Sequence, residues 1–193
     1  QPAPKPRNKP GSSVPVTPED TRGVGSAIAM GKTANATGFA TIAVGQGANA
    51  SFDTATAIGY QASASKEDAI ATGSKANASG NFAIATGAGA ASSAHGSIAT
   101  GFNSNASANA AIATGTQSNA SGVSSFAMGS SSNAAGADAI AMGSSSQAKL
   151  SNSIALGGNA KSLGADALAL GGAANASKDG AIAIGKEAKA NNT

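Results

Sequence analysis

One glycine recurs every 14 residues along most of this 193-residue chain, and no other feature limits its possible folds as strongly. The spacing holds through twelve consecutive copies without an insertion or a deletion, at Gly31, Gly45, Gly59, Gly73, Gly87, Gly101, Gly115, Gly129, Gly143, Gly157, Gly171 and Gly185. A fixed period of this kind is typical of repeat architectures, in which each repeat is one structural unit stacked on its neighbours. The chain is therefore expected to form a solenoid.

The residues that precede this glycine indicate strands. Alanine lies two positions before every glycine and isoleucine usually lies three positions before it, as in the run from Ile28 to Gly31. Larger apolar residues at i and i+2 follow the alternation of a strand and not a helical stripe. Fourteen residues accommodate two short strands and two turns, and glycine permits a positive φ at the first turn. We predict an all-β, parallel β-solenoid of twelve 14-residue coils over residues 23–193.

The chain before the first repeat has a different composition. All six prolines lie within the first 18 residues, which predicts an extended, proline-rich linker over residues 1–22 because proline fixes φ and cannot continue a ladder. The chain has no cysteine, which excludes disulfides and thiolate metal sites. It has no apolar run near the roughly 18 residues of a membrane span and no signal peptide. Attachment to a membrane is therefore expected only through an anchor outside these residues.

The large apolar residues of each repeat are expected to point into the coil. The alanine column would then face outward, where solvent normally favours threonine, lysine or glutamate. Either alanine merely suits a tight coil, or the column is buried against another chain. The shortage of large side chains favours the second explanation. The free energy that one coil gains by burying its apolar surface is smaller than the conformational entropy cost of ordering it. We predict a homo-oligomer whose interface is formed by Ala29, Ala43, Ala57, Ala71, Ala85, Ala99, Ala113, Ala127, Ala141, Ala155, Ala169 and Ala183.

The repeats resemble the head repeats of trimeric autotransporter adhesins of the YadA type, and the run from Asn152 to Gly157 is especially similar. The resemblance covers residues 23–193 and implies a left-handed parallel β-roll, a homotrimer, and display on the bacterial cell surface at the outer membrane. It also implies a role in virulence through attachment to host matrix proteins such as collagen, fibronectin or laminin, or to host cells. The neck, stalk and membrane anchor of the family are not seen in this sequence.

Chemistry that would support an enzyme is missing from the pattern. His95 is the only histidine, and without cysteine no nucleophile and base can be paired, so we expect no catalytic residue, no cofactor and no metal site. The carboxylates of the second turn are scattered and read as solvated charges: Asp53, Glu67, Asp68, Asp138, Asp166 and Asp179. A net charge of +3 without a basic stripe argues against nucleic acid as a partner.

Some turn residues are candidates for ligand binding. Aromatic residues often anchor protein partners, and several lie in or near the predicted turns: Phe39, Phe52, Tyr60, Phe82 and Phe102. The alternative, that they cover coil edges or pack across a trimer, stays open. No charged residue occurs between Lys75 and Asp138, which leaves about four coils with an uncharged flank.

Six asparagines match the glycosylation acceptor pattern Asn-Ala-Ser/Thr. Because they recur in the repeat frame, we expect a stacked asparagine ladder and not glycosylation. They are Asn35, Asn49, Asn77, Asn105, Asn119 and Asn175.

Two other functions are alternatives to an adhesin. An ice-binding solenoid is suggested by the ladder Thr72, Thr86, Thr100 and Thr114, but this ladder is expected in the inward column and spans four of twelve coils. A solenoid acyltransferase would need a hexapeptide period, and fourteen is not a multiple of six. The sequence therefore favours a non-enzymatic adhesin.

Overall fold

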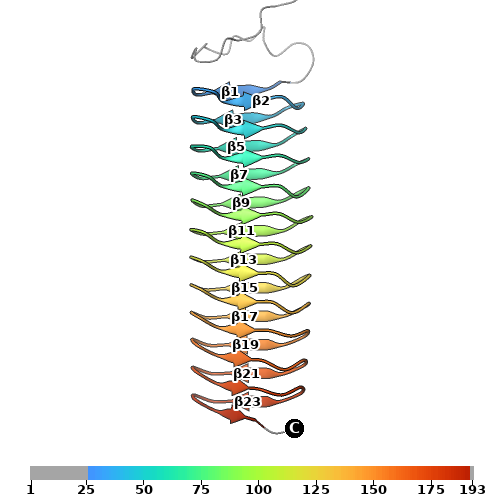
Figure 1. The fold of residues 1–193 in the computed structure, drawn as a ribbon, viewed down its shortest axis with the longest axis vertical. Coiled ribbons are helices and arrows are strands. Elements are labelled where there is room, and N and C mark those ends of the chain that lie inside the picture. The colour runs from blue at the N-terminus through green and yellow to red at the C-terminus, as the bar shows by residue number, and fades with distance from the viewer. Residues whose placement is uncertain (1–25, 192–193) are drawn as a thin grey trace, which may run out of the picture.

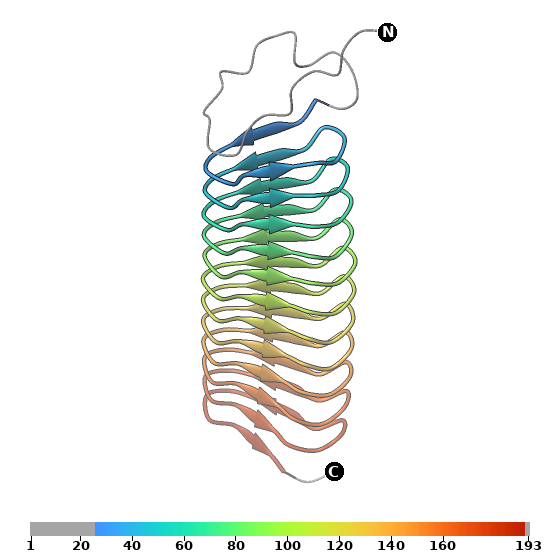
Figure 2. The ribbon, with the colours of Figure 1, turned by 45° about the horizontal axis from the view of Figure 1, so that its top comes forward.

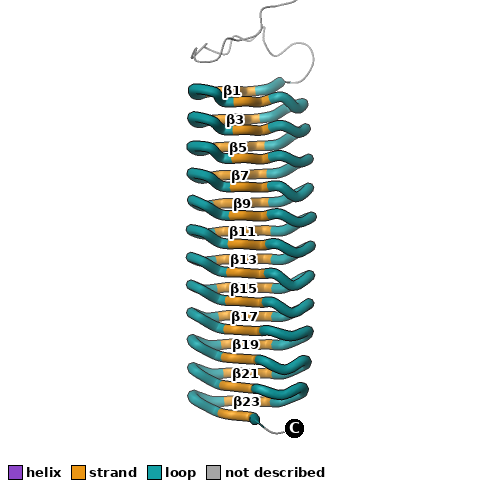
Figure 3. Tube along the Cα trace, viewed as in Figure 1, coloured by secondary structure: helices purple, strands orange, loops and turns teal. Residues whose placement is uncertain are grey.

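The computed structural model describes residues 26–191 as a rod of stacked coils (Figure 1). Each coil has one strand of three residues and one of two residues, joined by turns, and residues 26–191 contain no helix (Figure 3). The prediction of twelve two-strand coils is confirmed. The predicted linker over residues 1–22 lies outside the described residues.

The strands form two parallel sheets of twelve strands each, which run along opposite sides of the rod (Figure 2). The long-strand sheet contains β1 (Ile28–Met30), β3 (Ile42–Val44), β5 (Thr56–Ile58), β7 (Ile70–Thr72), β9 (Ile84–Thr86), β11 (Ile98–Thr100), β13 (Ile112–Thr114), β15 (Phe126–Met128), β17 (Ile140–Met142), β19 (Ile154–Leu156), β21 (Leu168–Leu170) and β23 (Ile182–Ile184). The short-strand sheet contains β2 (Asn35–Ala36), β4 (Asn49–Ala50), β6 (Ser63–Ala64), β8 (Asn77–Ala78), β10 (Ala91–Ser92), β12 (Asn105–Ala106), β14 (Asn119–Ala120), β16 (Asn133–Ala134), β18 (Gln147–Ala148), β20 (Lys161–Ser162), β22 (Asn175–Ala176) and β24 (Lys189–Ala190).

Each strand pairs with the strand one repeat further along the chain, in a register that matches equivalent residues. In the pair β11–β13, Ala99 lies opposite Ala113 and Thr100 opposite Thr114. The ladder continues into the turn, where the Gly115 amide donates to the Thr100 carbonyl at 2.8 Å. Equivalent positions of all repeats therefore form continuous columns along the rod, which is about 55 Å long for a 4.8 Å strand spacing.

The recurrent glycine is required at the first turn for two reasons. Its φ lies between 119° and 136° in all twelve coils, a region that side chains rarely adopt. A Cβ on Gly115 would also come within 2.7 Å of the carbonyl oxygen of Gly129 in the next coil. Two later turn positions have φ near 55° but tolerate other residues, such as Gln117 and Ser124. The strict glycine column thus reflects both φ and the close approach of stacked turns.

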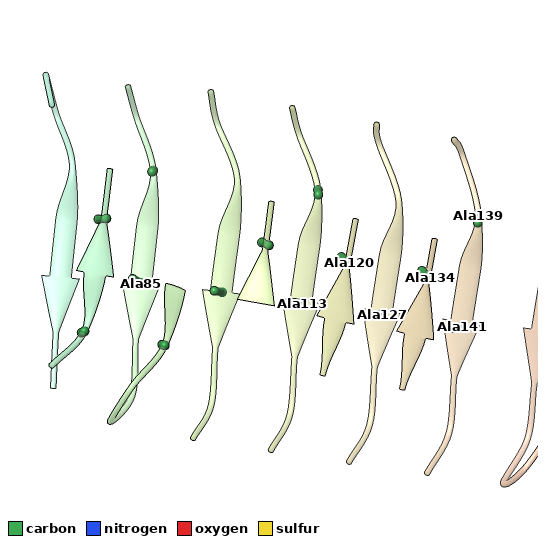
Figure 4. Packing of buried hydrophobic residues seen from close by; sticks show 14 of the residues in the cluster. Ala85, Ala113, Ala120, Ala127, Ala134, Ala139 and Ala141 are labelled. Carbon is green, nitrogen blue, oxygen red and sulfur yellow. The ribbon is translucent and has the colours of Figure 1, made fainter. Parts of the chain in front are cut away.

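The interior of the coil contains only small side chains. Alanine, serine and one threonine make up the fully buried set, and within residues 26–191 no side chain larger than Thr41 is fully buried. Alanines from both sheets meet there, as Ala113 and Ala127 of the long strands and Ala120 and Ala134 of the short strands show (Figure 4). Interior serines other than Ser125 satisfy their hydroxyls within the chain, as when Ser118 Oγ donates to the Gly115 carbonyl at 2.9 Å.

The prediction that the large apolar residues fill the coil is wrong. On the long strands the central alanine points inward, and the residues on either side of it point outward, such as Ile70 at 38% exposure beside Ala71 at 0%. The physical reason is the short coil. Facing sheets with large side chains packed between them lie about 10 Å apart. The short turns of this coil hold its two sheets closer together than that, so isoleucines cannot face each other between them. Alternation with period two is the same for either assignment of faces, so the pattern alone does not distinguish them.

Candidate functional site

The alanines predicted to form the chain interface are already covered within one chain. Ala29, in the first coil, is exposed, but the other eleven are between 0% and 3% exposed: Ala43, Ala57, Ala71, Ala85, Ala99, Ala113, Ala127, Ala141, Ala155, Ala169 and Ala183. Side chains buried inside the coil are not accessible to a partner. The prediction that the alanine column faces outward is therefore wrong.

The outer face of the long-strand sheet is an apolar surface that runs along the described rod. We call it the apolar face, and it consists of two columns, the first and the third residues of the long strands. Its members include Ile58, Met128 and Leu170, which are 39% to 40% exposed even with neighbours above and below. At about 55 Å by 10 Å, this surface is at the upper end of what monomers normally expose to water. Sequence reasoning missed it because it placed these residues inside.

Threonines interrupt one column of the apolar face. Thr72, Thr86, Thr100 and Thr114 follow one another in register, and like Ile58 and Met128 at the two ends of the run they point outward. The expectation that this ladder faces inward is wrong, for the same reason as for the isoleucines. One objection to an ice-binding surface is thereby removed. The other remains, because the ladder still spans only four of twelve coils.

The opposite face of the rod is polar, and it contains part of the predicted asparagine ladder. Asn105 Nδ2 donates to Asn119 Oδ1 at 2.9 Å, and Asn119 Nδ2 donates to Asn133 Oδ1 at 3.0 Å. A second pair joins Asn35 to Asn49 at 2.9 Å. The ladder is confirmed in these stretches and interrupted elsewhere by other residues of the column, such as Ala91.

The aromatic candidates lie on the two turn edges and are exposed. Phe39, Phe52 and Phe82 belong to the second turn, whereas Tyr60 and Phe102 belong to the first turn, with exposed fractions from 45% to 61%. The sequence therefore placed them correctly outside the coil. They do not gather into one cluster, because the two turns lie on opposite edges of the flattened coil (Figure 2).

Neighbouring coils provide partners for some of these aromatics. The Phe82 ring contacts the edge of His95 with centroids 5.3 Å apart and an interplanar angle of 67°. The Lys66 ammonium lies 5.3 Å from the Phe52 ring centroid, a cation–π distance. These contacts join coils along the second-turn edge and leave the outer surfaces of the rings accessible.

The turn carboxylates have a structural use that the sequence did not reveal. Asp53 Oδ1 accepts a hydrogen bond from the Phe39 amide at 2.8 Å, and Asp179 Oδ1 accepts one from the Ala165 amide at the same distance. Each satisfies a turn amide of the preceding coil. In residues 26–191, no group of three or more histidines, cysteines or carboxylates could hold a metal ion. No helix long and apolar enough to cross a membrane occurs in this described range.

A comparison with family models gives one match that covers most of the rod. The model described as the YadA head domain repeat, in two copies, matches residues 36–62, 64–90, 92–118, 120–146, 134–160 and 162–188. A comparison with curated proteins found no relative that matches. The matched residues include both sheets and every turn of the central coils.

Proposed function

Because the chain belongs to the YadA head family, a family of adhesin domains and not of enzymes, we propose that it is the head of a homotrimeric bacterial adhesin displayed at the outer membrane. The apolar face carries this proposal. Three chains would turn their long-strand sheets toward a common axis, and the polar short-strand sheets would face solvent.

Burial considerations support association through this face. The coil interior holds only alanine, serine and threonine, so no large apolar side chain of residues 26–191 is fully buried by folding of one chain, and several on the apolar face stay 38% to 63% exposed. Packing them against two further chains would remove them from water along the whole rod. An isoleucine column that faced solvent would instead be an aggregation hazard.

The proposed partners are host matrix proteins of the collagen, fibronectin or laminin class, or the surface of host cells. Contact would be made by the turn edges, which stay exposed when the apolar face is covered. Phe82 and Phe102 are the favoured anchors, because both are about half exposed and lie in the uncharged stretch between Lys75 and Asp138. Exposed aromatics provide apolar contact area for a protein partner.

The proposed mechanism is avidity. A three-fold rod repeats each weak site three times around its axis, and many heads on one surface raise the effective concentration further. Such a design makes firm attachment compatible with weak individual contacts.

Binding of head-coated beads to collagen, fibronectin and laminin tests this function directly. The expected result is binding to one of them by arrayed heads and much weaker binding by the free head. The double variant Phe82→Ser with Phe102→Ser should reduce binding at least several-fold, whereas Val123→Ser, on the same stretch, serves as the matched control. Absence of binding to all matrix proteins and to host cells would remove the support for this function.

A further inference from the structure

The four threonines of the apolar face form a continuous block. Thr72, Thr86, Thr100 and Thr114 occupy consecutive coils, and the eight other residues of their column are methionine, valine, isoleucine or leucine. If this face met water, threonine would be favoured along its whole length because it is polar and suits strands. The block is instead a local polar stretch in an apolar surface.

The hydroxyls of this block are free to bond outside their own chain. The threonine hydroxyls that bond within the described part of the chain belong to Thr33, Thr41 and Thr54. When the apolar face is covered, the four hydroxyls of the block need partners, since a buried polar group without one is costly. Equivalent threonines of the other two chains, directly or through a shared water, can provide them at the same level of the rod.

The repeat itself makes the alignment of chains ambiguous. A chain that slips by one coil, about 4.8 Å, still places apolar side chains opposite apolar side chains over most of the face and loses contact at one terminal coil. In the first-residue column, only Thr56 and Phe126 differ strongly from the surrounding isoleucines and leucine. Near-identical repeats therefore need a feature that penalises slippage.

We propose that the threonine block fixes the register in which three chains assemble, an inference that rests on the trimer proposed above. In register, threonine meets threonine in all four coils. A slip of one coil brings Thr72 to the level of Ile58, or Thr114 to the level of Met128, and leaves hydroxyls opposite apolar side chains. Single buried polar residues set register in coiled coils by the same physics.

A matched pair of quadruple variants tests the block. Replacing all four threonines by valine keeps the shape and strand preference of the side chains and removes the hydroxyls. Replacing all four by serine keeps the hydroxyls and removes the methyl groups. Both substitutions lie on the outer face and leave the alanine interior intact, and circular dichroism checks that the coils still form.

The readout is the isoleucine methyl NMR spectrum of refolded protein, with light scattering on the same sample. A three-fold trimer in register gives one signal for each isoleucine, whereas a slipped chain gives several. The native chain and the serine variant should each give one signal per isoleucine. The valine variant should give additional signals for Ile70, Ile84, Ile98 and Ile112, which neighbour the block.

The outcomes distinguish a failure of the proposed register role from a failure of the proposed trimer. A valine variant that is trimeric and keeps a single signal per isoleucine would overturn the role of the block and leave the trimer intact. A native chain that is monomeric by light scattering would overturn both. Extra signals in the serine variant equal to those in the valine variant would also contradict the role of the hydroxyls.

Discussion

Side-chain size decides which residues face into the coil. Alanine lies inside at 0% exposure in the central coils, and isoleucine lies outside, because the short turns hold the two sheets close together. The sequence predicted the glycine turn correctly from its period. It did not predict the facing of the strands, since strand alternation is symmetrical and hydrophobicity alone favoured isoleucine as the interior residue.

Two valine substitutions in neighbouring strands test this facing. Ala99→Val places two extra carbons in the closed interior and should lower the free energy of unfolding by about 1–3 kcal/mol through overpacking. Ala91→Val, on the outer side of β10, should change it by less than about 0.5 kcal/mol. Denaturant unfolding followed by circular dichroism measures both. Equal effects would contradict the assignment of faces.

Adjacent glycines provide a second test at this scale. A Cβ on Gly157 would meet the Gly171 carbonyl oxygen at 2.6 Å with φ at 129°, whereas a Cβ on Gly158 meets only the Ser144 oxygen, at 3.9 Å. Gly157→Ala should therefore lower the free energy of unfolding by about 2–4 kcal/mol. Gly158→Ala should stay within about 0.5 kcal/mol of the native chain. If thermal melting shows the two variants to be alike, the turn argument is wrong.

At the scale of the elements, each strand is too short to be stable alone, and its stability comes from the columns that it shares with its neighbours. The strands contain only two or three residues, yet the register repeats without a fault through all twelve coils. Period and alternation were sufficient to predict both strands and part of the asparagine ladder. Hydrogen bonds from turn amides to the carboxylates of Asp53 and Asp179 could not be predicted, because they depend on the distance between stacked turns.

The asparagine ladder should contribute where it is continuous. Asn119 bonds to both Asn105 and Asn133, so Asn119→Ala should lower the free energy of unfolding by about 1–2 kcal/mol. Asn77 lies between Ser63 and Ala91 in the same column, and Asn77→Ala should have little effect. Urea titration of the two variants measures both free energies of unfolding. Equal values for the two variants would show that the ladder does not stabilise the rod.

At the scale of the whole molecule, the rod fully buries its small residues and leaves its large ones partly exposed. This distribution supports the proposal that the chain acts as part of an oligomer, and the match to the YadA head family is consistent with it. The sequence predicted association but placed it on the alanine column, because an interior made only of small side chains was not considered. The face now proposed for association became evident only from the three-dimensional coil.

A charge placed on the apolar face should prevent assembly. Ile112→Lys puts an ammonium at the centre of this face, where burial without a partner is costly, and should give monomer or unfolded chain. Asn77→Lys is the matched control, because Asn77 lies outside the bonded ladder and lysine already occurs in that column at Lys161 and Lys189. Sedimentation analysis should find the control assembled like the native chain, and a dissociated control would argue against the choice of face.

The central claim, that chains meet through the apolar face, is tested most directly by the mass of the native protein in solution. Light scattering coupled to size-exclusion chromatography should give three times the 18.0 kDa of one chain. A folded, stable species at 18.0 kDa would contradict the claim, because the isoleucine and threonine columns would then face water along the whole rod.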